Sequence, residues 1–159
     1  MSSATLNGRP LNRRVFIAAL GSLFFINACE AKSMKVILNV VLFSYLDRPI
    51  FAVKIDGKVG ETSDSYPNTG KGVIAGVEFT LGEKIVTWKL DGPKGAPRIG
   101  EIVTNKNHLE LNEIVPGARY LGVHIYPDDT VELTTSVGRP DFTARGLSEV
   151  AKTGKHHGG

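Results

Sequence analysis

The spacing of turn-forming residues after residue 34 constrains the fold of this chain more than any other feature. Gly, Pro, Asn or Asp interrupts the sequence at intervals of about 8 to 15 positions, and the runs between them are rich in β-branched residues. No run shows the sustained 3.6-residue apolar period of a long helix. Short runs bounded by turns are typical of antiparallel strands. The sequence therefore predicts a mainly β protein, an antiparallel β-sandwich-like single domain over residues 35–137, with a short helical or disordered C-terminal tail over residues 138–159.

One hairpin, over residues 119–135, can be predicted together with its register. A three-residue loop at 127–129 places residue 125 opposite 131 and residue 123 opposite 133, so the apolar side chains of both strands point the same way. A loop of even length would place Ile125 opposite Glu132 and break that match. The odd register leaves a solvent-facing outer face with four side chains on it: Tyr120, His124, Tyr126 and Glu132.

The same pattern predicts the other strands. The stretch 35–43 is apolar on both faces, as expected of a central strand. Trp88 alternates with two aliphatic residues and is expected in the core. We also predict a strand at 50–56 ending in the Asp56-Gly57 turn, a hairpin of residues 73–79 and 84–90 around 81–83, a short edge strand near 99–103, and surface loops at 57–72 and 91–100.

The net charge of +3 does not indicate a nucleic-acid partner, because the surplus lies in one short segment. Residues 1–28 contain three arginines and no acidic residue, so the 19 Lys and Arg of the chain leave 16 against 16 Asp and Glu in the remaining sequence. Proteins that neutralise nucleic-acid phosphates gather their surplus cations on one face. The balanced charges after residue 28 argue against nucleic-acid binding.

The most apolar segment, residues 15–28, is typical of an export signal. It contains no charge and no proline, and as a helix it would measure about 21 Å, less than the roughly 30 Å of a bilayer core. Arginines precede it and small residues end it, as in a cleaved secretory signal peptide. We expect residues 1–28 to be removed after Sec or twin-arginine export, because Arg13-Arg14 fits both routes.

Cys29, the only cysteine, follows this segment directly. Ile26-Asn27-Ala28-Cys29 resembles the bacterial lipobox, in which the cysteine sulfur becomes a thioether to diacylglycerol. We expect a lipidated Cys29 and an anchor and linker over residues 29–34, which would hold the protein without a membrane helix; the alternative is an incidental cysteine after an ordinary signal peptide. Glu30 stands where an Asp would favour the inner membrane, so we expect the periplasmic face of the outer membrane. A single cysteine also leaves the domain without disulfides.

Motifs that would indicate an enzyme are not found. Residues 146–150 lack the second glycine of a nucleophile elbow, and residues 69–72 lack the rest of a phosphate-binding loop. The four histidines have no partner at metal-ligand spacing. Asp128 and Asp129 are first of all turn residues. The sequence therefore predicts no enzyme activity, no cofactor and no metal site.

Protein recognition suits the predicted hairpin better. Tyrosines offer large, rigid contact areas, and carboxylates in a loop can pair with basic groups of a partner. We expect the partner-binding surface to combine the outer face of the hairpin with its loop: Tyr120, His124, Tyr126, Asp128, Asp129 and Glu132.

Three blocks of sequence, residues 40–60, 87–95 and 118–133, resemble a family of small bacterial lipoproteins encoded beside phospholipase effectors of type VI secretion. The first block contains a tyrosine, an Asp-Arg pair and a strand that ends in a glycine turn. The resemblance implies an immunity protein that binds and neutralises a lipase effector in the periplasm, protecting the cell against self or sibling intoxication. Two other classes stay open: a structural or assembly lipoprotein of the outer membrane, and an enzyme acting on glycans or lipids.

Overall fold

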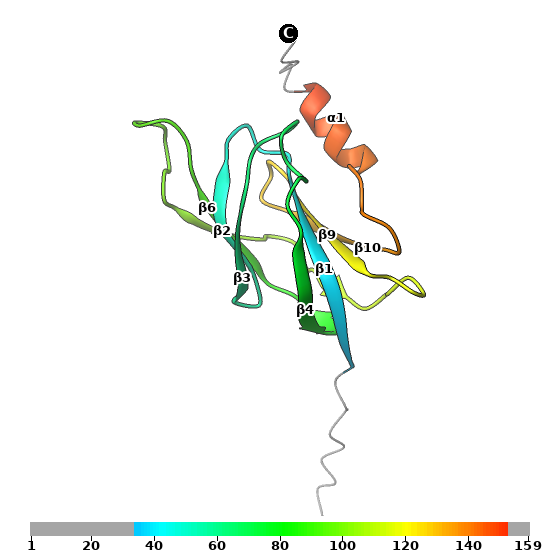
Figure 1. Cartoon of the computed structure of the whole chain (residues 1–159). Coiled ribbons are helices and arrows are strands. Elements are labelled where there is room, and N and C mark those ends of the chain that lie inside the picture. Colours follow the sequence, from blue (N-terminus) through cyan, green and yellow to red (C-terminus); the bar gives the residue numbers. More distant parts are fainter. Residues whose placement is uncertain (1–33, 153–159) are drawn as a thin grey trace, which may run out of the picture. The chain divides into compact units, whose positions relative to one another are not determined.

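The computed structural model describes residues 34–152, so the predicted signal peptide, Cys29 and most of the linker lie outside the described residues. That range contains ten strands and one helix, and Figure 1 shows how the longer ones are arranged. The elements are β1 (Lys35–Ser44), β2 (Ile50–Ile55), β3 (Lys58–Ser63), β4 (Ile74–Thr80), β5 (Gly82–Glu83), β6 (Val86–Leu90), β7 (Ile102–Thr104), β8 (Glu110–Leu111), β9 (Tyr120–Ile125), β10 (Val131–Ser136) and α1 (Ala144–Lys152).

Two four-stranded sheets pack face to face, which confirms the predicted mainly β class. Sheet A has the order β10-β9-β1-β4, sheet B has the order β3-β2-β6-β7, and β5 pairs with β8. The sheets lie on opposite sides of the domain in Figure 1. Their inner faces share one core, in which Val40 of β1 and Val123 of β9 join Val53 and Trp88 of sheet B. Trp88 is fully buried, as predicted. All these strand pairs are antiparallel except β1 with β9, which is parallel.

β1 is buried on both faces, as its uniformly apolar sequence predicts. Val40 and Leu42 belong to the core between the sheets, whereas Val41 and Phe43 belong to a second cluster on the opposite face of sheet A. We call that opposite face the outer face. A central strand covered on both sides needs apolar residues at successive positions, because successive side chains point to opposite faces.

The predicted register of the β9–β10 hairpin is confirmed. Ile125 pairs with Val131, His124 with Glu132 and Val123 with Leu133. The short edge strand predicted near residues 99–103 is confirmed as β7, which pairs with β6 at the edge of sheet B.

The predicted hairpin of residues 73–79 and 84–90 is wrong. β4 pairs with β1 in sheet A, whereas β6 pairs with β2 and β7 in sheet B. Between them the chain forms β5, in which Gly82 pairs with Leu111 of β8. The two arms bury their apolar residues through different sheets, so proximity in sequence did not identify their partners.

The predicted surface loop over residues 57–72 is wrong for its first part. The backbone turns through Asp56 and Gly57, both with positive φ, and continues as β3 antiparallel to β2. Two successive positive φ angles favour a tight hairpin, as the predicted Asp-Gly turn requires. β3 lies at the edge of its sheet, where a polar, glycine-containing sequence can pair through its backbone alone.

Packed structure extends beyond the predicted boundary at residues 137 and 138. Residues 139–152 lie beside the outer face of sheet A (Figure 1). We call this segment, which includes α1, the strap. Phe142 and Val150 of the strap pack against the outer-face cluster of Val41, Phe43, Tyr45 and Tyr126. The predicted tail thus contains a helix over Ala144–Lys152, and residues 139–152 form part of the domain; the rest of the tail lies outside the described residues.

Candidate functional site

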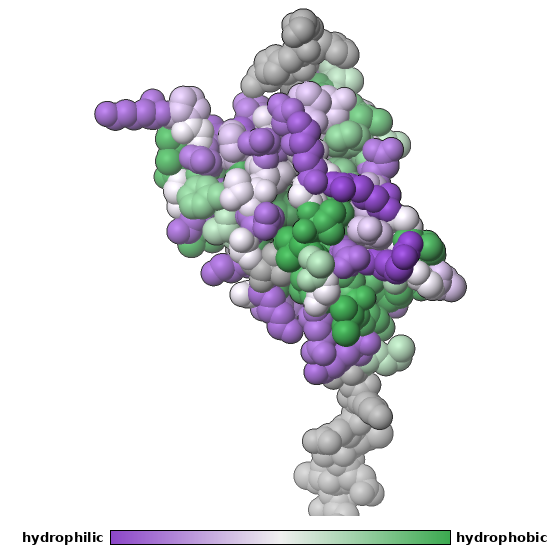
Figure 2. Space-filling model, in the orientation of Figure 1, coloured by the Kyte–Doolittle hydropathy of each residue, from purple (hydrophilic) through white to green (hydrophobic). Residues whose placement is uncertain are grey.

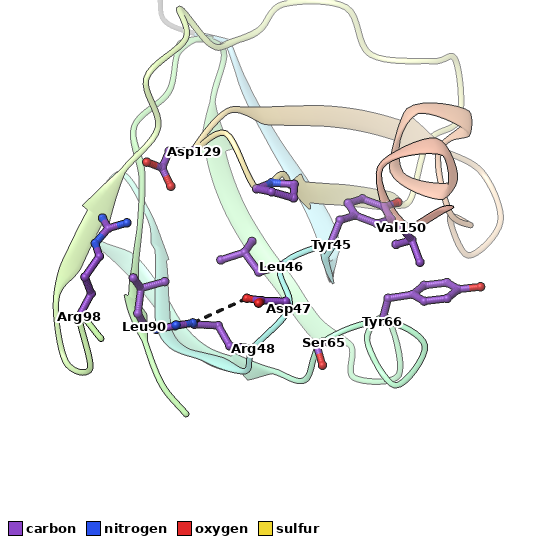
Figure 3. Close-up of a pocket in the computed structure, with 11 residues that line it drawn as sticks. Tyr45, Leu46, Asp47, Arg48, Ser65, Tyr66, Leu90, Arg98, Asp129 and Val150 are labelled. Atoms are coloured by element: carbon purple, nitrogen blue, oxygen red, sulfur yellow. Dashed lines mark ion pairs between the residues drawn. The ribbon is translucent and has the colours of Figure 1, made fainter. Parts of the chain in front are cut away.

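A pocket of about 550 Å³ lies where the end of β1, the hairpin loop and α1 meet (Figure 3). We call it the pocket. Its lining comes from segments far apart in the sequence: Tyr45, Leu46, Asp47, Arg48, Ser65, Tyr66, Leu90, Arg98, Pro127, Asp129 and Val150.

The β1–β2 connection forms one wall of the pocket. Tyr45 is held at the end of β1 by its backbone N–H, which donates to the carbonyl of Ile125 at 2.9 Å. Arg48 is mostly buried, and its Nη1 donates to the carbonyl of Pro97 at 2.7 Å. Its Nε lies 3.8 Å from Oδ1 of Asp47, whose side chain is 62% exposed. The Asp-Arg pair of the sequence therefore places a fixed cation and an accessible anion at the mouth of one cavity.

Two further lining residues, Arg98 and Asp129, are held in ion pairs. Arg98 donates from Nε and Nη2 to both carboxylate oxygens of Glu101, each at 2.7 Å. Asp129, at the tip of the β9–β10 hairpin, pairs with Lys106 at 2.7 Å. Because every one of these lining charges has an opposite charge beside it, the rim is polar without a net charge of one sign. Leu46, Leu90 and Val150 add apolar surface.

Apolar lining together with paired charges at the rim suits recognition of a protein surface that carries both apolar and charged groups. Apolar lining favours an aliphatic or aromatic group, while paired charges at the rim can exchange partners with charged groups of a bound protein. The most accessible of these charges is the Asp47 carboxylate, because the carboxylate of Asp129 is mostly buried.

The predicted binding surface is only partly brought together here. Asp129 lines the pocket, and Asp128 lies beside it in the same loop with its side chain exposed. Tyr120 and Glu132 are half-buried. Cys29 lies outside the described residues.

The prediction of a solvent-facing position is wrong for His124 and Tyr126, both of which are fully buried. The physical reason is the strap, which covers the outer face of sheet A at these positions. Thr143 of the strap hydrogen-bonds the Tyr126 hydroxyl at 2.7 Å, and the Arg145 guanidinium stacks 3.8 Å from the centre of the Tyr126 ring. Neither buried side chain can touch a partner while the strap is in place.

The strap covers a continuous hydrogen-bonded network. The Tyr45 hydroxyl accepts from the Thr143 N–H at 3.0 Å and is hydrogen-bonded to Nδ1 of His124 at 3.1 Å. Nε2 of His124 is hydrogen-bonded to Thr134 at 3.0 Å. The Tyr126 hydroxyl donates to Glu132 at 2.6 Å. Both nitrogens of the buried imidazole are therefore satisfied by neutral hydroxyls.

Burial sets the protonation of this network. It lowers the pKa of His124 to about 4, against a smaller opposing effect of the nearby Glu132 carboxylate. Burial also raises the pKa of both Tyr45 and Tyr126. All three rings are neutral at neutral pH. Phe43 stacks on His124 with 4.6 Å between the ring centroids, and Tyr45 stacks on Tyr126 with 5.1 Å between the ring centroids.

Sequence reasoning missed most of the pocket. Leu46-Asp47-Arg48-Pro49 reads locally as a turn, and Arg98 lies in a segment interpreted as an exposed loop. A signal was present in Val41 and Phe43 of β1 and in Tyr45 directly after it, which alternate onto one face. Three apolar or aromatic side chains on that face indicate that another segment of the chain covers it.

Among residues 34–152, no cluster of three or more His, Cys, Asp or Glu side chains is arranged to hold a metal ion, and no helix is long and apolar enough to cross a bilayer.

Comparison with known proteins adds no assignment: no family model, no curated protein and no solved structure matches this chain.

Proposed function

We propose that this protein is a periplasm-facing lipoprotein, anchored in the outer membrane through Cys29, that binds and neutralises a lipase effector of type VI secretion. The pocket is the proposed contact site. One observation carries the proposal: the three blocks that resemble immunity lipoproteins, far apart in sequence, meet around the pocket. The first block supplies Tyr45 to Arg48, the second supplies Leu90, and the third supplies Pro127 and Asp129.

The chemistry of the pocket supports protein binding. A partner residue that enters it gains contact with Leu46 and Leu90, and a basic group beside that residue meets the exposed carboxylate of Asp47. Interface energy concentrates where an apolar anchor enters a pocket and charged groups surround it. Complementary charges at such a rim mainly raise the rate of association.

The proposal predicts that a neighbouring gene encodes a lipase, and the direct test is coexpression with that lipase. The anchored protein should co-purify with that lipase and should restore growth of cells in which the lipase is directed to the periplasm. If it neither binds nor protects, the proposed function is wrong. A constitutive partner in the same membrane, without any effect on a lipase, would instead favour a structural or assembly lipoprotein.

A charge series at Asp47 tests the pocket itself. Asp47→Lys should weaken binding about tenfold or more, which corresponds to ~1.4 kcal/mol, and Asp47→Asn should weaken it less. Glu113→Lys makes the same charge change at an exposed residue outside the pocket, near the start of β9, and should leave affinity unchanged. Equal affinity for the Asp47→Lys and Glu113→Lys proteins would move the contact site away from the pocket.

A further inference from the structure

Five large apolar side chains are exposed at one end of the domain. Their exposed fractions range from 45% to 68%, with Met34 and Ile37 the most exposed. The five residues are Met34, Ile37, Ile85, Val115 and Val137. We call this set the apolar end.

Strand register places three of these residues beside the beginning of β1. Met34 directly precedes β1, and its carbonyl accepts a hydrogen bond from the Leu81 N–H at 2.8 Å. β9 runs parallel to β1 with Tyr120 opposite Asn39, so Val115, five positions before Tyr120, lies toward the start of β1. Val137 follows Ser136, which pairs with Tyr120.

The other two residues belong to the same end. Ile37 is the third residue of β1 and pairs with Glu78 near the end of β4. Ile85 follows β5, which begins two residues after Thr80, the partner of Lys35. The strap covers the outer face only from Val41 onward, so it leaves Ile37 open. Figure 2 shows strongly hydrophobic residues at the surface in the middle and lower part of the domain, with hydrophilic residues beside them where the chain enters β1.

The length of the linker restricts what can cover the apolar end. Met34 is five residues after Cys29, and five residues span at most about 18 Å when fully extended. A lipid on Cys29 would hold the first residue of the domain within that distance of the bilayer. An apolar surface at such a tether meets lipid far more often than it meets any soluble protein.

We infer that the apolar end rests on the bilayer surface, with Met34 and Ile37 inserted among the lipid headgroups. This inference rests on the proposed lipidation of Cys29. It goes beyond anchoring, because it gives the domain one orientation. β1 has ten residues and is about 30 Å long, and Tyr45 of the pocket directly follows it. The pocket therefore faces away from the membrane, toward a partner arriving through the periplasm.

The charges at this end indicate apolar rather than electrostatic contact. Lys35 pairs with Glu78 at 2.9 Å. Lys58 and Arg119 add two exposed cations, while Glu83 and Glu113 add two exposed carboxylates. Since neither sign dominates, the contact should depend little on salt or on the fraction of anionic lipid.

Two single-cysteine labels test the orientation. The substitutions Ile37→Cys and Leu147→Cys are each made in the full chain. Each protein is purified from bacterial membranes, labelled with an environment-sensitive maleimide and reconstituted into vesicles. Both positions are exposed and apolar, and Leu147 lies in α1, close to the pocket end of the domain. The vesicles consist of phosphatidylethanolamine and phosphatidylglycerol and contain a nitroxide-labelled lipid that quenches the fluorescence of the maleimide. Quenching at position 37 should be several-fold stronger than at position 147. Quenching at position 37 should also be the same in low and high salt.

The controls separate this inference from the proposed function. The unsubstituted chain should take up no label, because lipid occupies Cys29; labelling there would show that the anchor itself is missing. With the anchor intact, equal quenching at positions 37 and 147 would overturn the inference. Shielding of position 37 from water without quenching by the labelled lipid would also overturn it, because a second copy of the chain or another protein would then cover the apolar end.

Discussion

His124 is a histidine that is fully buried, whereas histidine side chains are usually at least partly exposed. It lies at the centre of the outer face, stacked on Phe43 and fully removed from solvent. A buried imidazole is stable only while neutral, because the protein interior solvates its cation poorly. Protonation of this one side chain is therefore coupled to the integrity of the covered face.

This coupling predicts acid sensitivity. Folding lowers the pKa of His124 from 6.5 to about 4, so the unfolded chain binds a proton between these values while the folded chain does not. The stabilisation is complete above pH 6.5 and is lost as the pH falls toward 4, by up to about 3 kcal/mol. Urea unfolding at several pH values in this window should show a free energy that falls with acidification, and His124→Gln should flatten the dependence.

His108 provides the matched control. It is exposed, and its hydrogen bond to Glu110 raises its pKa, so its small contribution has the opposite sign: it is present at low pH and is lost as the pH rises through the raised pKa. His108→Gln should leave the acid sensitivity intact. If His108→Gln flattens the profile and His124→Gln does not, the buried network is not its source.

At the scale of elements, two contacts attach the strap to sheet A: Gly146 packs against the Tyr45 ring, and the Arg145 guanidinium stacks on the Tyr126 ring. Gly146 packs directly against the Tyr45 ring, and a Cβ at this position would overlap the ring. One helical turn earlier, the Thr143 hydroxyl caps α1 by accepting the Gly146 N–H at 3.0 Å. The helix therefore begins where the strap docks on sheet A.

Gly146→Ala should loosen the strap although alanine favours helices over glycine by up to about 1 kcal/mol. Overpacking against Tyr45 should cost about 1 to 3 kcal/mol, and hydrogen exchange of the α1 amides should become faster. Gly138→Ala is the matched control, because a Cβ there meets no atom within 4 Å. Unchanged exchange in the Gly146→Ala protein would show that the strap does not depend on this contact.

Arg145 should act as a second attachment point. Its guanidinium stacks on Tyr126 and pairs with Asp128 at 2.9 Å. Arg145→Ala should destabilise the strap by about 1 kcal/mol, measured by limited proteolysis after residue 138. Lys152→Ala removes an exposed ion pair with Glu149 at the far end of α1 and should have no such effect. The Asp128 contact also means that charge reversal there disturbs the strap, so Asp128 is a poor probe of partner binding.

For the whole molecule, the two ends of sheet A have different properties. The beginning of β1 carries the apolar end, and the pocket opens beyond the end of β1. Under the proposed function, one end faces lipid and the other faces the effector, so a short linker restrains orientation as well as position.

Removal of the lipid should therefore abolish protection of the cell while leaving the affinity for the lipase nearly unchanged. Cys29→Ser should shift the protein from the membrane to the soluble periplasmic fraction, while its affinity for the lipase stays within about twofold. Glu30→Asp is the control that keeps the cysteine and should change sorting between membranes. Fractionation and the intact mass of the protein measure both effects, and a Cys29→Ser protein that has lost its leader yet remains in the membrane would contradict lipid anchoring.

Local sequence determined the features that depend on neighbouring residues. Alternation alone placed Val123 and Ile125 opposite Leu133 and Val131, because a slip of one residue would have turned every apolar side chain to the wrong face. The same reasoning placed Trp88 in the core, and the Asp56-Gly57 pair in a turn. The proposal of a lipid on Cys29 likewise needs only four adjacent residues.

Tertiary structure decided the rest, because strand partners and covered faces depend on contacts between distant residues. β4 and β6 are close in sequence yet join different sheets, β4 beside β1 and β6 between β2 and β7. His124 and Tyr126 are polar enough for a solvent-facing strand, but distant residues cover them: Thr143 and Arg145 of the strap contact Tyr126, and Phe43 of β1 stacks on His124. The pocket exists for the same reason: Asp47, Leu90 and Asp129 have no relation in sequence, and the packing of two sheets brings them together.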